Sequence, residues 1–182
     1  MMNKLNPLIF ITPFIALCLV VFLYFILSKK TENKILFKHY VVIIFALAFI
    51  FNFVWEVLQM PLYMGGSLNI AHVAFCALAS VADAIMVLLI YFCFALFYKN
   101  PLWFQNLTLP RILLLMFTGA IGAILAEIRH LSAGNWSYNT SMPILPIVDV
   151  GLSPVLQFML LPPLIYYLSY RMKKDRSNQK SN

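Results

Sequence analysis

The chain has 182 residues, of which 63% are hydrophobic and only 10% are charged. Soluble domains carry about a quarter charged residues, so this composition excludes an ordinary soluble domain and predicts an all-α integral membrane protein. The formal net charge of +7 does not indicate nucleic-acid binding, because the basic residues gather beside apolar runs, where they report membrane orientation.

Five apolar segments are each long enough to cross a bilayer as a helix, which takes about 20 residues. They lie at about 8–28, 40–62, 71–98, 111–131 and 150–170. We interpret the first as a retained helix and not a cleaved signal, because its apolar core is long and no small-residue cleavage site precedes Lys29. Residues 1–182 are then one helical bundle, ending in a basic tail at 171–182.

The basic residues predict the orientation of the bundle. Eleven of the thirteen fall on one side of the five segments: Lys29, Lys30, Lys34, Lys38, Lys99, Arg111, Arg171, Lys173, Lys174, Arg176 and Lys180. The positive-inside rule places this side in the cytoplasm, with the N-terminus outside. We expect the protein to lie in a bacterial inner membrane and to contact membrane lipids. A homo- or hetero-oligomer is compatible with the sequence.

Polar side chains inside the second segment fall on one helical face. Asn52, Glu56, Gln59 and Tyr63 are separated by four, three and four residues, a spacing that repeats with the turn of a helix. Ionisable groups inside a membrane cost at least ~2.5–3.5 kcal/mol each on insertion scales, so they usually face the protein and often carry function. Trp55 neighbours the acid on this helix.

The third and fourth segments carry similar groups. His72 and Asp83 share a face of the third, and Glu127 and His130 lie one turn apart in the fourth. The pairs Gly119–Ala123 and Gly122–Ala126 have the small-xxx-small spacing that lets helices approach closely. We expect the three acids to converge on one chamber that is open to the outside.

The segment after the fourth helix, "AEIRHLSAGNWSYNTSMPILP" at 126–146, combines Arg129 and His130 with Trp136 and Tyr138. We interpret it as the rim and lid of the chamber. An interfacial aromatic belt would explain the two rings equally well.

The second and third segments resemble the fourth and fifth, as in a duplication. Aligning Glu56 with Glu127 sets Gln59 opposite His130 and Asp83 opposite Pro154. Both units start on the basic side, so the predicted repeat is parallel.

Residues 122–170 resemble the membrane-bound lycopene cyclase domain of the heterodimeric bacterial and fused fungal types. That domain has an acid, then a G-x-W-x-aromatic-Asn element, and later a Leu-Pro-Ile-Glu-Glu motif. Here Glu127 precedes Gly134-Asn135-Trp136-Ser137-Tyr138-Asn139, and Leu156-Gln157 stands in place of the two glutamates. The resemblance implies a repeated helical bundle around an apolar ligand.

We therefore predict a protein that binds or converts an apolar isoprenoid or lipid, by acid-assisted isomerisation or cyclisation, with no cofactor or metal. A buried carboxylic acid would donate the proton, and aromatic faces would stabilise a cation. The predicted catalytic residues are Glu127, Glu56, Asp83 and His130. The predicted substrate-binding residues are Trp55, Asn52, Gln59, His72, Arg129, Trp136, Tyr138 and Gln157.

Three alternatives stay open at this point. Intramembrane acids and histidine also serve as proton relays, so a small proton-coupled carrier fits the pattern. Glu127 and His130 have the Glu-x-x-His spacing of di-iron bundles. The chain could also be a non-catalytic accessory subunit of a membrane assembly.

Overall fold

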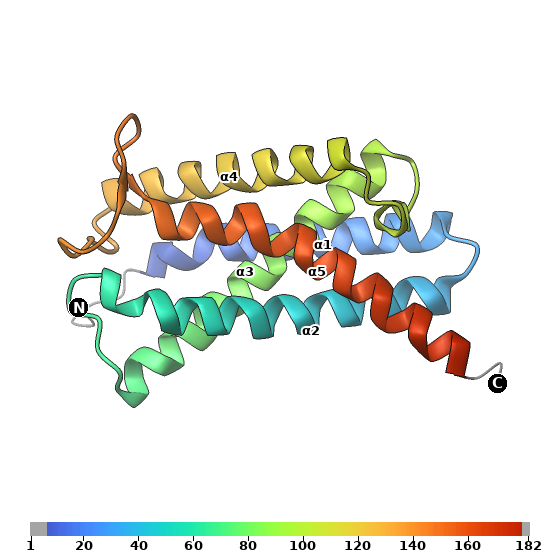
Figure 1. Ribbon diagram of the computed structural model, residues 1–182, viewed down its shortest axis with the longest axis horizontal. Helices are drawn as coiled ribbons and strands as arrows, with labels where there is room; N and C mark the ends of the chain where they lie inside the picture. The colour runs from blue at the N-terminus through green and yellow to red at the C-terminus, as the bar shows by residue number, and fades with distance from the viewer. Residues whose placement is uncertain (1–6, 180–182) are drawn as a thin grey trace.

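Five long helices make up most of the computed structural model, which describes residues 7–179 (Figure 1). They are α1 (Ile11–Lys30), α2 (Lys34–Gln59), α3 (Ile70–Phe97), α4 (Leu109–Ser132) and α5 (Leu152–Gln179). Each is long and apolar enough to cross a membrane. The predicted all-α, five-helix membrane fold is therefore confirmed.

The remaining elements are short; η1 precedes α1, and the others lie in the connections. Three are 3-10 turns: η1 (Pro7–Phe10), η2 (Met60–Leu62) and η3 (Trp103–Gln105). Two are strands, β1 (Ile144–Leu145) and β2 (Val150–Gly151), which pair antiparallel with Ile144 opposite Gly151. These strands form a small hairpin that the sequence pattern did not predict.

Two helices extend further into basic sequence than predicted. α2 begins at Lys34, six residues before the predicted start at 40, because the Asn33 side chain accepts a hydrogen bond from the Leu36 N–H (2.9 Å) and caps the helix. α5 continues past residue 170 to Gln179, through the basic tail. The last part of that predicted tail, 180–182, lies outside the described residues.

The helices pack in the order α1, α3, α2, α5, α4, so that α3 lies between α1 and α2, and α5 between α2 and α4. α4 and α5 approach closely at Gly119, where an added Cβ would lie 1.9 Å from the Phe158 carbonyl oxygen. Gly122 has open space around it, so only the first predicted small-residue pair lies at a helix contact. α2 packs on α3 and α4 on α5, as the predicted helix pairs require; the duplication itself stays a prediction.

The connections divide between the two ends of the bundle (Figure 1). The α1–α2 and α3–α4 connections and the end of α5 lie at one end, which we call the basic end. The α2–α3 connection, η2 and the β1–β2 hairpin lie at the other, which we call the hairpin end. The sequence-based assignment of the basic residues to one side therefore agrees with the fold.

A cluster of aromatic side chains fixes the basic end. Trp103 is fully buried and donates from Nε1 to the Tyr91 carbonyl oxygen (3.2 Å), while the Tyr91 hydroxyl donates to the Pro101 carbonyl oxygen (2.6 Å). Arg111 donates to the carbonyl oxygens of Trp103 and Asn106. The α3–α4 connection is thus folded into the bundle, which leaves the opposite end for the polar site.

Candidate functional site

A network of amides and carboxyls joins three helices towards the hairpin end, and Gln157 of α5 is at its centre. The Gln157 Nε2 lies 2.8 Å from Asn52 Oδ1, 3.1 Å from Asp83 Oδ2 and 3.4 Å from Glu56 Oε1. An amide nitrogen has two hydrogens to donate, so these three acceptors share them. One buried side chain therefore connects α5 to acids on both α2 and α3.

The same network continues through Gln59 of α2. Its Nε2 donates to Glu56 Oε1 (2.7 Å) and to Gln157 Oε1 (3.1 Å). Its Oε1 accepts from the Ser153 hydroxyl (2.8 Å), and Ser153 in turn accepts from Trp55 Nε1 (3.2 Å). Each donor in this series of hydrogen bonds therefore meets an acceptor, as the apolar surroundings of a membrane helix bundle require.

Glu56 and Asp83 therefore face one amide, and no basic side chain is among their hydrogen-bond partners in the described residues. Both residues are half-buried. Asn52 donates from its own amide to the Ala48 carbonyl oxygen (2.7 Å), which fixes the orientation of its Oδ1 towards Gln157. The arrangement can hold, accept or release a proton between two neighbouring carboxyls.

Glu127 of α4 lies in a second, aromatic group. Its Oε2 accepts from Trp136 Nε1 (3.2 Å) and from the Tyr138 hydroxyl, and the side chain is only 6% exposed. Both donors use the same oxygen. Within residues 7–179, no hydrogen bond uses the other oxygen, Oε1, so this oxygen is available to carry a proton or meet a ligand.

His130 acts on Glu127 through Trp136 and does not bind it directly. The imidazole stacks on the Trp136 ring at 4.3 Å between centroids and 22° between planes. Its Nδ1 lies 2.8 Å from Asn135 Nδ2. The ring of His130 therefore holds the indole that donates to Glu127, and its predicted catalytic role stays a prediction.

The α2–α3 and α4–α5 connections are hydrogen-bonded to each other at the hairpin end. Tyr63 and Tyr138 form an antiparallel bridge, and the Met64 N–H donates to the Ser137 carbonyl oxygen (2.9 Å). The Asn139 N–H donates to the Leu62 carbonyl oxygen (2.8 Å). The segment that the sequence indicated as a lid is therefore fixed to the end of α2.

Tyr63 is the third ring of the aromatic group around Glu127. Its ring contacts those of Tyr138 (5.5 Å) and Trp136 (6.3 Å). Burial raises the pKa of Tyr63, and the nearby carboxyls of Glu127, Glu56 and Asp83 raise it further. One phenol is thus within electrostatic range of all three acids, although only two of them share hydrogen-bond partners.

The same surroundings also raise the pKa of Tyr138. Burial raises the pKa of its hydroxyl, and the hydrogen bond that it donates to Glu127 raises it further. The hydroxyl therefore remains a donor to Glu127 at neutral pH.

Two predicted site residues lie apart from the acids. His72 is in the first turn of α3, where its Nδ1 lies 3.0 Å from both the Ser67 hydroxyl and Asn69 Nδ2. It closes the α2–α3 connection. Arg129 is exposed on α4, on a different face from buried Glu127. The structure therefore assigns neither residue a contact with the amide network.

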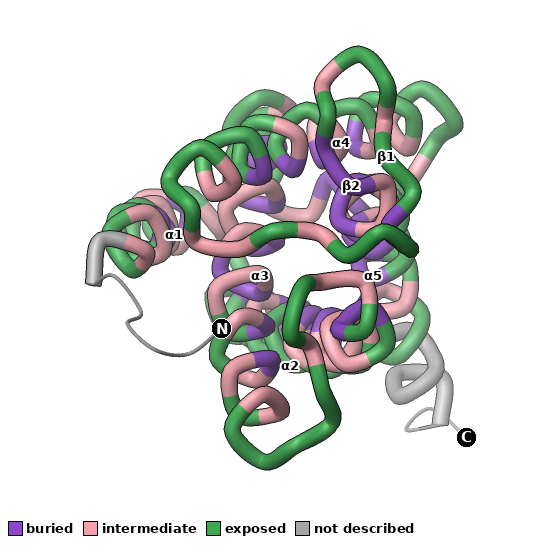
Figure 2. The backbone as a smooth tube through the Cα atoms, turned by 90° about the vertical axis from the view of Figure 1, so that its left-hand side faces the viewer, coloured by how far each residue is buried: buried purple, intermediate pink, exposed green. Residues whose placement is uncertain are grey.

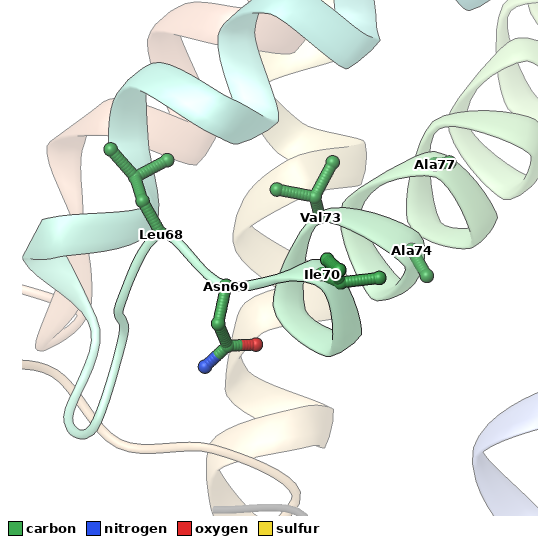
Figure 3. A pocket seen from close by; sticks show the side chains of 6 residues that line it. All are labelled: Leu68, Asn69, Ile70, Val73, Ala74 and Ala77. Atoms are coloured by element: carbon green, nitrogen blue, oxygen red, sulfur yellow. The ribbon is translucent and has the colours of Figure 1, made fainter.

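The predicted open chamber lined by the three acids stays a prediction. The hollow drawn in Figure 3 lies at the start of α3 and is lined by Leu68, Asn69, Ile70, Val73, Ala74 and Ala77. None of the three acids lines it. The acids are instead occupied by the side chains around them, so a ligand would have to displace or join these contacts.

The described residues contain no group of three or more histidine, cysteine or acidic side chains that could hold a metal ion. His130, half of the Glu-x-x-His pair, is engaged with Trp136 and Asn135.

Sequence reasoning missed Ser153 and Asn135. Ser153 lies four residues before Gln157 on α5, so the helical spacing could have identified it. Asn135 gave no such signal, because its contact with His130 depends on how the chain turns after α4.

No protein-family model, curated protein or solved structure matches this chain.

Proposed function

We propose that this chain binds an apolar isoprenoid or lipid in the membrane and converts it by acid-assisted isomerisation or cyclisation, with Glu127 as the proton donor. The observation that carries the proposal is the asymmetric setting of the Glu127 carboxyl. One oxygen is held by Trp136 and Tyr138, and the other accepts no hydrogen bond from residues 7–179.

The chemistry needs only what these side chains supply. Transfer of the Glu127 proton to a carbon–carbon double bond forms a C–H bond and leaves a carbocation on the ligand. The two donors on Oε2 stabilise the carboxylate that remains. Loss of a different proton to that carboxylate forms the new double bond and restores the acid, so no oxidant or reductant is consumed.

The aromatic rings support the same reaction. Trp136 and Tyr138 both donate to the acid, and the Tyr63 ring packs against both of their rings. A ring face attracts a cation by about 0.5–2 kcal/mol, with the larger values in desolvated sites. Their arrangement beside a buried proton donor favours an enzyme of this class over a simple structural role for Glu127.

Mass spectrometry of the apolar lipids in membranes that contain the protein tests the proposal. Glu127→Gln keeps the shape and the acceptor oxygen but cannot supply an acidic proton. We expect the converted lipid to disappear while the bound precursor is retained. Glu32→Gln is the matched control, because Glu32 is an exposed acid in the α1–α2 connection. Conversion by the Glu127→Gln protein equal to that of the unchanged protein would contradict the proposal and favour an accessory subunit.

A proton-coupled carrier is the second candidate, supported by the Glu56–Gln157–Asp83 contact across α2, α5 and α3. Helices that move during transport would separate or rejoin these acids, with uptake or release of a proton. In vesicles with an imposed pH gradient, a carrier would acidify or alkalinise the lumen when its substrate is added, and Asp83→Asn would abolish that change.

We assign the basic end to the cytoplasm, with the N-terminus outside and a bacterial inner membrane as the setting. The basic residues beside the α1–α2 and α3–α4 connections support this orientation.

A further inference from the structure

The hairpin formed by residues 143–151 projects sideways from the bundle, past α4 (Figure 1). Figure 2 looks at the hairpin end and shows the turn between β1 and β2 extending beyond the α4 backbone. The turn carries a large apolar side chain at its tip, Ile147, which is 95% exposed. An exposed isoleucine at the tip of a projecting turn is not explained by packing within the chain.

The hairpin is two-sided. On its inner side, Val150 is fully buried with Ala123 of α4, and Leu145 and Val148 pack against the same cluster. On its outer side, Ile144 is 43% exposed and Ile147 is almost fully exposed. The inner contacts hold the hairpin rigidly, so the outer side chains are presented in a fixed direction.

The contacts with α4 also fix the level of the hairpin along the bundle. α4 continues as an apolar helix long enough to span the membrane to Ser132, and the hairpin packs on α4 through Val150, which shares a buried cluster with Ala123. The hairpin therefore lies beside the last turns of a spanning helix, not beyond its end. At this level a bilayer changes from acyl chains to headgroups.

The backbone of the hairpin needs little water. Pro143 and Pro146 have no N–H, and the Val148 and Asp149 N–H groups both donate to the Leu145 carbonyl oxygen (3.3 and 2.9 Å). The Leu152 N–H donates to the Pro143 carbonyl oxygen (2.7 Å), and the strand residues are paired. Non-helical backbone near lipid is tolerated where its polar groups are satisfied internally, as at these residues. The Ile147 N–H makes no hydrogen bond within the described residues, so the tip of the turn must keep access to the hydrated headgroups.

One charge limits how deep the hairpin can lie. Asp149 is exposed at the end of the turn, with a left-handed backbone (φ 53°), a conformation that aspartate adopts more readily than most residues. A carboxylate stays in the headgroup region, whereas the neighbouring isoleucines prefer the acyl chains.

We propose that the hairpin is an interfacial membrane-binding element, with Ile144 and Ile147 inserted at the boundary between headgroups and acyl chains of the leaflet at the hairpin end. Interfacial elements bury their apolar side about 5–10 Å into this boundary. The inference is independent of the proposed reaction. It does concern the same region, because an added Cβ at Gly151 would lie 3.1 Å from the Tyr138 ring, so the base of the hairpin touches a donor to Glu127.

A fluorescent label at the tip tests the proposal. Ile147→Cys is prepared in a chain whose native cysteines, Cys18, Cys76 and Cys93, are replaced by alanine, labelled with an environment-sensitive dye and reconstituted into phosphatidylcholine vesicles. We expect blue-shifted emission, with most of the fluorescence lost when the vesicles contain lipids that carry a nitroxide just below the headgroup. Lipids with the nitroxide at the acyl terminus should quench less.

Ser141→Cys is the matched control, because Ser141 is exposed in the same connection but outside the hairpin. Its dye should emit as in water and be quenched by aqueous iodide. A water-like spectrum at Ile147→Cys, equal to the control, would overturn the proposal. So would a blue-shifted signal that resists every nitroxide lipid and disappears on dilution of the protein in lipid, since a second copy of the chain would then cover the tip.

Discussion

Replacing Gln157 with leucine should destabilise the bundle measurably. Leucine has a similar volume but removes the amide that donates to Asn52 and Asp83 and accepts from Gln59. Gln157 is 2% exposed, so water cannot replace these contacts. The apolar packing changes little, and the effect of Gln157→Leu therefore reports on the network.

The size of the effect follows from these three contacts, the shortest of the four that the Gln157 amide makes. Interhelical hydrogen bonds in membrane proteins average about 0.6 kcal/mol, which gives about 2 kcal/mol for the three. Buried groups left without a partner cost about 1–3 kcal/mol each, so a larger loss follows if Asn52, Asp83 and Gln59 find no new partners. We expect the free energy of unfolding to fall by about 2–4 kcal/mol.

Unfolding of the purified chain in mixed micelles of mild and denaturing detergent, followed by circular dichroism, measures this change. Gln105→Leu is the matched control, because Gln105 is exposed and makes one long hydrogen bond (3.4 Å) to the Tyr40 hydroxyl; its effect should stay within about 0.5 kcal/mol. Combining Gln157→Leu with Asn52→Leu should cost less than the sum of the two single changes. A Gln157→Leu protein as stable as the unchanged protein would refute the argument that Gln157 holds α2, α3 and α5 together.

Gly119→Val should prevent correct assembly of α4 on α5 and abolish folded protein in size-exclusion chromatography, whereas Gly122→Val should be tolerated, because only the first glycine meets the α5 backbone. Equal behaviour of the two variants would contradict the observed helix contact. The raised pKa of Tyr63 makes its neutral form part of the folded state, so its contribution to stability is complete below the unfolded value of about 10 and is lost as pH rises above it. Tyr63→Phe should therefore flatten the fall in unfolding free energy between about pH 9 and 11, and an unchanged pH profile would argue against a buried phenol. For the orientation, a membrane-impermeant thiol reagent added outside cells should label Ser141→Cys and not Asn33→Cys, in a chain without native cysteines; the opposite result would reverse the topology.

The sequence was sufficient to predict the helices, because hydrophobic length is a direct consequence of bilayer thickness. It was less reliable at the ends of α2 and α5, where the structure continues the helices into basic residues. There the local cap at Asn33, and not the change in hydropathy, decides the first residue of the helix.

Helical spacing correctly predicted that Asn52 and Gln59 of α2 face the interior of the bundle. It did not predict which residues of the other helices they contact. Helical spacing shows that Glu56 and Gln59 share a face, whereas the contact of Gln59 with Gln157 depends on which helix packs against that face. His72 illustrates the converse. Its spacing from Asp83 fits one face of α3. Because it lies in the first turn of that helix, however, its ring contacts Ser67 and Asn69 of the α2–α3 connection.

The residue at position 157 finally bears on the resemblance to the lycopene cyclase domain, which stays a prediction. That family has glutamates where this chain has Leu156 and Gln157. In this structure a carboxylate at 157 would take the place of an amide nitrogen that lies 3.1 Å from Asp83 Oδ2 and 3.4 Å from Glu56 Oε1. A third acid there could only repel the other two or compete for protons, since no basic side chain is among their hydrogen-bond partners in the described residues. Glutamine donates where glutamate would accept, so the amide is what allows two acids from α2 and α3 to approach one point on α5. The departure from the family motif is therefore consistent with the acids around position 157. The candidate proton donors of this chain are then Glu56, Asp83 and Glu127, the last of which lies in the aromatic group.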